Sequence, residues 1–129
     1  MQKASTVARY LLGLIYLIFG LNGFLNFIPA PPNMPEGAMA FAGALAGSGY
    51  FFPFLKGTEV LMGALLLSGF AVPFAYVVLA PITLNIFLFH FVLTPGIQNS
   101  ALPIFMVILS LLGAYNYKDL YAQLFTTKK

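Results

Sequence analysis

Four long apolar segments constrain this chain more than any other feature of its sequence. They run from about Ala8 to Ile28, from Pro53 to Ala71, from Pro73 to Leu93 and from Leu102 to Tyr117. A helix rises ~1.5 Å per residue, so the first segment reaches roughly 30 Å, which is the thickness of the hydrocarbon core of a bilayer. These segments therefore predict helices that cross a membrane.

The composition agrees with this prediction. Charged residues make up 7% of the chain and hydrophobic residues 60%, whereas soluble domains carry about 25% charged residues. A soluble fold would have too few polar side chains to cover its surface. We therefore expect an all-α protein in which residues 1–129 form a single membrane domain, a transmembrane four-helix bundle. The predicted spans are 8–28, 53–71, 73–93 and 102–117, the last with an interfacial extension to about 125.

The segment 29–52 is predicted to lie outside the membrane, between the first and second spans. It opens with a proline-rich stretch, and Asn33 precedes Glu36 at the spacing of an N-cap and its partner. A short extracytoplasmic surface helix is expected from Met34 to about Ala46, ended by Gly47 and Gly49. A connection of this length can be a lid over the outer end of the bundle or an inert cap, and the sequence leaves both open.

The orientation follows from the distribution of basic residues, because short cytoplasmic flanks are enriched in Lys and Arg. Only Lys56 lies on the side of the 29–52 segment. The other five basic residues lie on the side of the two termini: Lys3, Arg9, Lys118, Lys128 and Lys129. Both termini of this multi-pass protein are therefore expected on the cytoplasmic side of a cytoplasmic membrane. The first span is interpreted as retained, since it is longer than the ~7–15 apolar residues of a signal peptide.

Several function classes are disfavoured by composition. The chain has no cysteine, which excludes thiol catalysis and thiolate metal sites. One histidine and three carboxylates make a metal site of several ligands improbable, and no Gly-rich phosphate loop is present. The basic residues form no cluster that would bind nucleic acid. No motif indicates that the chain is a catalyst by itself.

Polar residues gather in the outer half of the predicted bundle. A charge in hydrocarbon costs several kcal/mol, so such side chains face the bundle interior and find partners. We expect an outer-side cavity centred on Glu59, which can pair with Lys56 three residues before it and reach toward His90. The candidate ligand-binding residues are Glu59, His90, Lys56, Asn85, Asn22 and Asn26.

Each of these residues also has a purely structural interpretation. The asparagines can join helices, Lys56 and Glu59 can form a local salt bridge, and His90 can anchor a helix end. Asn85 stands about 140° from His90 on a regular helix, so it lines another wall or binds a neighbouring helix. Small residues at helical spacing are interpreted as packing seams: Arg9, Gly13, Tyr16, Gly20 and Gly23 in the first span, and Met106, Ser110, Gly113 and Tyr117 in the fourth.

The stretch LAGSGYFFPFLKGTEVLMGALLLSG (45–69), with a glutamate four residues before a glycine, resembles the second-helix pattern of the DoxX family. ARYLLGLIYLIFGLNGFLNF and PITLNIFLFH are also similar to DoxX or DoxX-like proteins. The resemblance covers about residues 7–125. It implies a four-helix bundle in the bacterial cytoplasmic membrane. It also implies, for some members, a link to quinone-coupled oxidation of sulfur compounds or to membrane oxidoreductase complexes. Glu59, and less closely Asn85 and His90, match recurrent polar positions.

Two functions of different classes remain. The first is an accessory subunit of a membrane oxidoreductase system that binds a quinone or another small hydrophobic ligand and receives electrons from a redox partner protein. Apolar side chains would supply a slot, and Glu59, Lys56 and His90 would supply hydrogen bonds and proton exchange. The second is a non-enzymatic membrane protein that binds lipid or supports the assembly of a partner.

Overall fold

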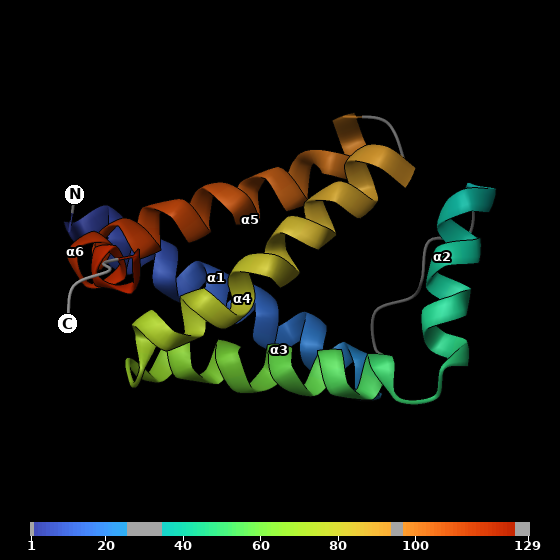
Figure 1. Ribbon diagram of the computed structural model, residues 1–129, viewed down its shortest axis with the longest axis horizontal. Coiled ribbons are helices and arrows are strands. Elements are labelled where there is room, and N and C mark those ends of the chain that lie inside the picture. Colours follow the sequence, from blue (N-terminus) through green and yellow to red (C-terminus); the bar gives the residue numbers. More distant parts are fainter. Residues whose placement is uncertain (1, 26–34, 94–96, 126–129) are drawn as a thin grey trace.

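The structure is a computed structural model that describes residues 2–25, 35–93 and 97–125, and these residues are all-α (Figure 1). The all-α prediction is therefore confirmed. The elements are α1 (Gln2–Leu25), α2 (Glu36–Gly47), α3 (Phe51–Ser68), α4 (Val72–Leu88) with its π-helical continuation η1 (Phe89–Leu93), α5 (Ile97–Tyr115), α6 (Lys118–Ala122) and the 3-10 turn η2 (Gln123–Phe125).

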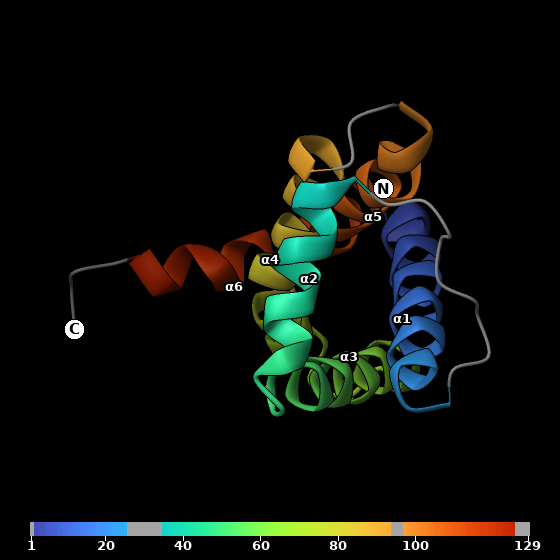
Figure 2. The ribbon, with the colours of Figure 1, turned by 90° about the vertical axis from the view of Figure 1, so that its right-hand side faces the viewer.

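Four of these helices, α1, α3, α4 and α5, lie alongside one another. Helix α1 packs on α3 and α5, and α4 packs on the same two helices (Figure 2). Both termini and the turn between α3 and α4 lie at one end, which we call the terminal end. Helix α2 lies across the opposite end, the α2 end (Figure 1). Each long helix therefore runs from one end of the molecule to the other.

Three stretches are long and apolar enough to cross a membrane: Lys3–Leu25, Phe51–Ser68 and Val72–Leu93. Within the described residues, the last helical region reaches this length only when Ser100–Tyr115 is combined with Lys118–Phe125, and the two are bent by 85°. Many large apolar side chains face outward, such as Leu61 and Leu111. An outward apolar surface on long helices is what a bilayer requires.

The closest helix approach is between α1 and α3. A Cβ added to Gly63 would lie 2.9 Å from the Gly13 carbonyl oxygen and 2.9 Å from the Leu17 amide nitrogen. The two backbones are therefore in direct contact, as glycines allow in membrane helices. The predicted glycine seam of the first span is confirmed at this crossing. The core beside it is built from buried side chains of four helices, including Leu12, Leu66, Leu79 and Leu109.

Helix α3 ends and α4 begins within a very short turn. Gly69 takes φ 83°, in the left-handed region that glycine adopts without cost, and its N–H donates to the Leu65 carbonyl at 3.0 Å. Ala71 also has a positive φ, 53°, which is uncommon for a residue with a side chain. The left-handed Gly69 stops α3 at Ser68, three residues before the predicted end of the span at 71.

Two further helix limits differ from the limits of the predicted spans. Asn99 and Ser100 precede the predicted start of the last span at Leu102, but α5 begins at Ile97 and includes both. Asn and Ser favour turns through local hydrogen bonds, yet Ser100 is buried in the packed structure, and packing outweighs that local preference. Helix α1 begins at Gln2, ahead of the predicted Ala8, and residues 26–28 of that predicted span lie outside the described residues.

Helix α2 also begins later than predicted. Its N-cap is Pro35, which makes no side-chain cap hydrogen bond, and the expected capping by Asn33 opposite Glu36 stays a prediction. Pro35 has φ −56° and ψ 152°, outside the helical region, so the helix begins after it. Asn33 and Met34 lie outside the described residues. The predicted stop is confirmed: α2 ends at Gly47, and Gly49 takes φ 83°.

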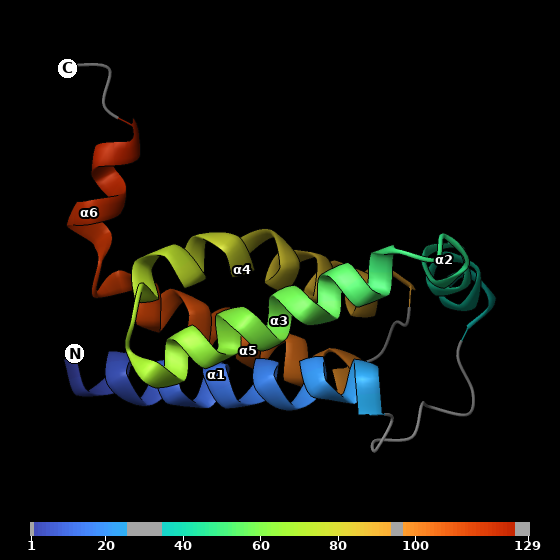
Figure 3. The same ribbon diagram turned by 90° about the horizontal axis from the view of Figure 1, so that it is seen from below.

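Helix α6 turns away from the long helices at the terminal end (Figure 3). Its anchor is Tyr121, whose hydroxyl donates to the Pro73 carbonyl oxygen at 2.8 Å. Partial burial raises the pKa of Tyr121 to about 12, so the hydroxyl remains a donor at neutral pH. Pro73 lies in the first turn of α4, next to the turn from α3, so this hydrogen bond joins α6 to the start of α4.

Candidate functional site

The buried ion pair on α3 is the first element of the candidate site. Lys56 Nζ lies 3.4 Å from Glu59 Oε1, as the spacing of the two residues predicts. The Glu59 residue is only 2% exposed. It lies near the middle of α3, about 12 Å along the helix from Phe51 at ~1.5 Å per residue. A carboxylate at that depth needs a counter-charge, and Lys56 supplies it from the same helix.

Helix α1 closes over this ion pair. A Cβ added to Gly20 would lie 2.9 Å from the Val60 amide nitrogen and 3.1 Å from the Glu59 Cβ. A Cβ added to Gly23 would collide with the Lys56 side chain. Two glycines of α1 therefore make room for the two charged residues of α3. No space for a ligand is left between them on this side.

A second polar contact joins α1 to α4. The Tyr16 hydroxyl and the Thr83 hydroxyl form a hydrogen bond between two buried residues. Tyr16 also lies within electrostatic reach of the Glu59 carboxylate. Sequence reasoning placed Tyr16 in a packing seam and did not select Thr83 as a site residue. Thr83 could have been selected because a hydroxyl in the middle of an apolar helix needs a hydrogen-bond partner when it is buried.

An apolar cleft of about 200 Å³ lies between α3 and α4 toward the α2 end. It is lined by Phe51, Leu55, Pro81, Ile82, Asn85 and Ile86. Among these described lining residues Asn85 alone has a polar side chain, an amide that can both donate and accept. Pro81 and Asn85 are exposed, so the cleft opens on the outer surface of the helices. An apolar pocket with few polar groups is typical of sites for hydrophobic small molecules.

His90 lies just beyond this cleft, in the π-helix η1. Its Nδ1 is 2.8 Å from the carbonyl oxygen of Ile86, one of the cleft residues. A carbonyl only accepts, so Nδ1 carries a proton, and in the tautomer that holds this proton alone Nε2 can act as an acceptor. The ring also meets Phe89 edge-on at a centroid distance of 5.3 Å. Single turns of π-helix are frequent at functional sites.

The structure thus divides the predicted polar cavity into two parts. Lys56 and Glu59 face α1, whereas Asn85 lines the cleft between α3 and α4, and Ile86 connects that cleft to His90. The described hydrogen bonds of Glu59 and His90 do not join them, and a contact between the two stays a prediction. Asn22 is half-buried on α1. Asn26 lies outside the described residues.

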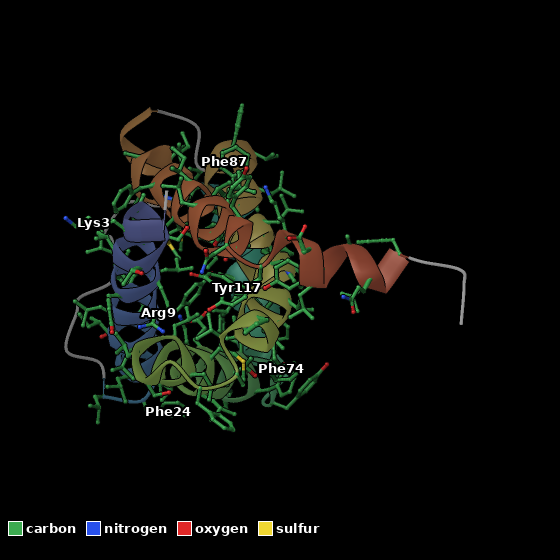
Figure 4. All side chains as sticks on the ribbon, turned by 90° about the vertical axis from the view of Figure 1, so that its left-hand side faces the viewer. Lys3, Arg9, Phe24, Phe74, Phe87 and Tyr117 are labelled. Carbon is green, nitrogen blue, oxygen red and sulfur yellow. The ribbon has the colours of Figure 1, made fainter. Side chains whose placement is uncertain are left out.

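The terminal end holds a polar cavity that sequence reasoning missed. It has a volume of about 100 Å³ and is lined by Ser5, Thr6, Arg9, Tyr76, Gly113, Asn116 and Tyr117. Figure 4 looks onto this end, with Arg9 and Tyr117 between the helices and Lys3 pointing outward. Arg9 Nε and the Tyr76 hydroxyl are buried there, and neither has a hydrogen-bond partner in the part of the chain that the structure describes. The signal in the sequence was an arginine inside an apolar helix, which was interpreted as part of a packing seam.

Over the described ranges, no three His, Cys, Asp or Glu side chains lie close enough to hold a metal ion. Comparison of the chain with models of known protein families, with curated proteins and with solved structures found no match. The site is therefore interpreted from its own geometry.

Proposed function

We propose that this chain is a DoxX-like, four-span protein of the bacterial cytoplasmic membrane that binds a quinone or a similar hydrophobic ring compound in the cleft between α3 and α4. In this proposal it serves as an accessory subunit of a membrane oxidoreductase system. The observation that carries the proposal is the apolar cleft beside Asn85, connected through Ile86 to His90. The apolar walls suit a ring and its tail, and the Asn85 amide can donate to a ring carbonyl.

The tautomer of His90 suits the reduced form of such a ligand. A quinol that becomes a quinone releases two protons and two electrons. In the tautomer with Nδ1–H donating to Ile86, the Nε2 atom of His90 can accept one of the two quinol protons as a general base, and the second proton passes to water. The two electrons pass to a redox centre of a partner protein, because the chain has no cysteine and no cofactor motif. This direction of electron flow is opposite to the one expected from the sequence, where the partner was the electron donor.

The ion pair has a supporting role in this proposal. Glu59 and the inner part of the Lys56 side chain pack against Gly20 and Gly23 of α1, so the pair holds α1 and α3 in register rather than contacting the ligand. This departs from the expectation that Glu59 is the centre of the ligand site. The Tyr16–Thr83 hydrogen bond fixes α4 against α1 in the same way.

The experiment is to purify the full-length chain from membranes, extract it with solvent and identify co-purified molecules by mass spectrometry. We expect quinone in the extract. Ile82→Trp, which fills the cleft, should remove it, and Asn85→Leu should reduce it. Leu84→Trp is the matched control, because Leu84 lies two residues away on an exposed face. Quinone retained in Ile82→Trp, or lost equally in Leu84→Trp, would contradict the proposal.

The alternative is a non-enzymatic protein that binds lipid or supports the assembly of a partner. One observation favours it: Pro81 and Asn85 are exposed, so an acyl chain of the bilayer can also enter the cleft. The same extraction separates the two functions. Phospholipid that is lost in Ile82→Trp, with no quinone in the native extract, identifies the cleft as a lipid site.

A further inference from the structure

We propose that the cavity at the terminal end is a binding site for a phosphate group, held by Arg9 and Tyr76. The phosphate belongs either to the headgroup of an anionic phospholipid or to free inorganic phosphate. This site is separate from the cleft between α3 and α4 and does not depend on the proposed function.

The charge of the cavity favours an anion. Within residues 2–25, 35–93 and 97–125 the structure pairs Arg9 with no carboxylate, and none of the lining residues is acidic. The guanidinium stacks on the Tyr10 ring, with its central carbon 4.4 Å from the ring centroid, which fixes its position without neutralising it. A partly buried cation without a counter-charge is costly, and an anion in the cavity would supply that charge.

The hydrogen-bonding groups favour the same ligand. Tyr76 is 4% exposed, and its buried hydroxyl has no hydrogen-bond partner among the described residues. It points over Gly113, where an added Cβ would collide with the hydroxyl. Arg9 Nε is a second buried donor without a partner. Buried polar groups normally have partners, so two unpartnered groups at one cavity mark the place of a missing acceptor.

The depth of the cavity matches a phospholipid headgroup. Gly113 lies about 3 Å from the end of α5, and Tyr76 about 6 Å from the start of α4, at ~1.5 Å per residue. When α4 and α5 span a bilayer, these positions lie near the helix ends, at the interface where lipid phosphates are found. Arginine presents several N–H donors in a planar fork that fits phosphate oxygens, and a volume of about 100 Å³ admits a group of this size rather than a larger ligand.

The test uses the full-length chain in a neutral detergent with three probes: inorganic phosphate at constant ionic strength, dioleoylphosphatidylglycerol, and dioleoylglycerol, which has the same acyl chains without phosphate. Affinity is measured by calorimetry for phosphate and by native mass spectrometry for the lipids. Binding of both phosphate probes identifies a site that free phosphate also reaches, and binding of phosphatidylglycerol alone identifies the headgroup as the source. Dioleoylglycerol, which lacks the phosphate, should not bind measurably.

Two variants test the named residues. A hydrogen bond to a charged group corresponds to about 10- to 100-fold in affinity. Tyr76→Phe should therefore weaken phosphate binding about tenfold, and Arg9→Gln about a hundredfold. The matched controls are Tyr115→Phe and Lys118→Gln, a surface pair at the same end whose Nζ and hydroxyl oxygen lie 3.0 Å apart outside the cavity. Both controls should bind like the native chain.

The melting temperature of Tyr76→Phe, with and without phosphate, is a second and independent test of the site. Without phosphate, Tyr76→Phe should melt at or above the temperature of the native chain, because it removes an unpartnered hydroxyl. With phosphate, it should melt below the native chain. Three results would each overturn the proposal: no probe binds, which leaves a water-filled cavity; Lys118→Gln weakens binding as much as Arg9→Gln; or Tyr76→Phe binds with native affinity.

Discussion

Glu59, which is buried, and Arg9, which is partly buried, have opposite surroundings in the fold. Glu59 has its counter-charge on its own helix, and α1 packs against it until no space remains. Arg9 has no carboxylate partner in the described part of the chain and borders a cavity lined by polar groups. A charge that the chain neutralises itself holds helices together. A charge that it leaves unneutralised beside a cavity is available to a ligand.

The largest expected effect concerns the ion pair. Lys56→Met leaves the buried Glu59 carboxylate without its counter-charge, and breaking a buried pair in this way costs about 3 kcal/mol. Glu59→Gln should cost less than about 1 kcal/mol, because an amide keeps a hydrogen-bonding group and Lys56 can extend outward. The free energy of unfolding in mixed micelles measures both. If Lys56→Met is as stable as Glu59→Gln, then Glu59 does not need Lys56 as its counter-charge, and the contrast with Arg9 is wrong.

The next largest effect is expected from replacing the glycines that lie beside the two charged residues. Gly20→Ala should destabilise the fold by about 2 kcal/mol, because the new methyl meets the α3 backbone. Gly113→Ala should cost less than about 1 kcal/mol, since its methyl meets the end of the Tyr76 side chain, which can move.

Gly113→Ala should nevertheless abolish phosphate binding, because the displaced Tyr76 fills the cavity. Gly57→Ala is the control, since nothing lies within 4 Å of its added Cβ, and helix propensity alone should stabilise it by about 0.5–1 kcal/mol. Equal destabilisation by Gly20→Ala and Gly57→Ala would show that α1 does not seal the ion pair.

A smaller effect is expected at the contact between α1 and α4. Tyr16→Phe and Thr83→Val should each cost about 1 kcal/mol, because each leaves the other hydroxyl buried and unpartnered. The double variant should cost less than the sum of the two. A double-mutant cycle of unfolding free energies measures this coupling. Strictly additive costs would mean that the two hydroxyls do not depend on each other.

The smallest effect is expected outside the long helices. Tyr121→Phe removes the hydrogen bond from α6 to Pro73, worth about 0.5 kcal/mol at a half-exposed position. Hydrogen exchange of the α6 amides should become about twofold faster, while exchange in α3 stays unchanged. Faster exchange in all helices would instead show that α6 unfolds together with the long helices.

The helices were the part of the fold that the sequence predicted well. Long apolar segments with few charges leave little choice but helices of membrane length, and the Lys56–Glu59 pair followed from spacing on one helix. The limits of α2 and α5 were predicted less well, because Pro35 and the packing of Ser100 decided them. Signals from neighbouring residues in the sequence carry no information about which side chains pack together in the folded protein.

The site was predictable only in part for the same reason. Depth along a helix comes from residue numbers, but the direction in which a side chain points depends on neighbours. Glu59 and Asn85 were expected in one cavity and face different helices. Arg9 was assigned to a packing seam because its partners at the cavity come from α4 and from the residues at the end of α5, which no local pattern connects.

The left-handed residues of the α3–α4 turn have a consequence for how the chain enters a membrane. With Gly69 at φ 83° and Ala71 at φ 53°, the two helices are joined with almost no slack. Neither helix can then cross a bilayer while the other waits in water, since the connection is too short to hold them at independent positions. With this turn on the same side as the termini, α4 must enter the bilayer again directly after α3 has crossed it, so we expect α3 and α4 to insert in immediate succession, with Lys56 and Glu59 crossing as a neutral pair.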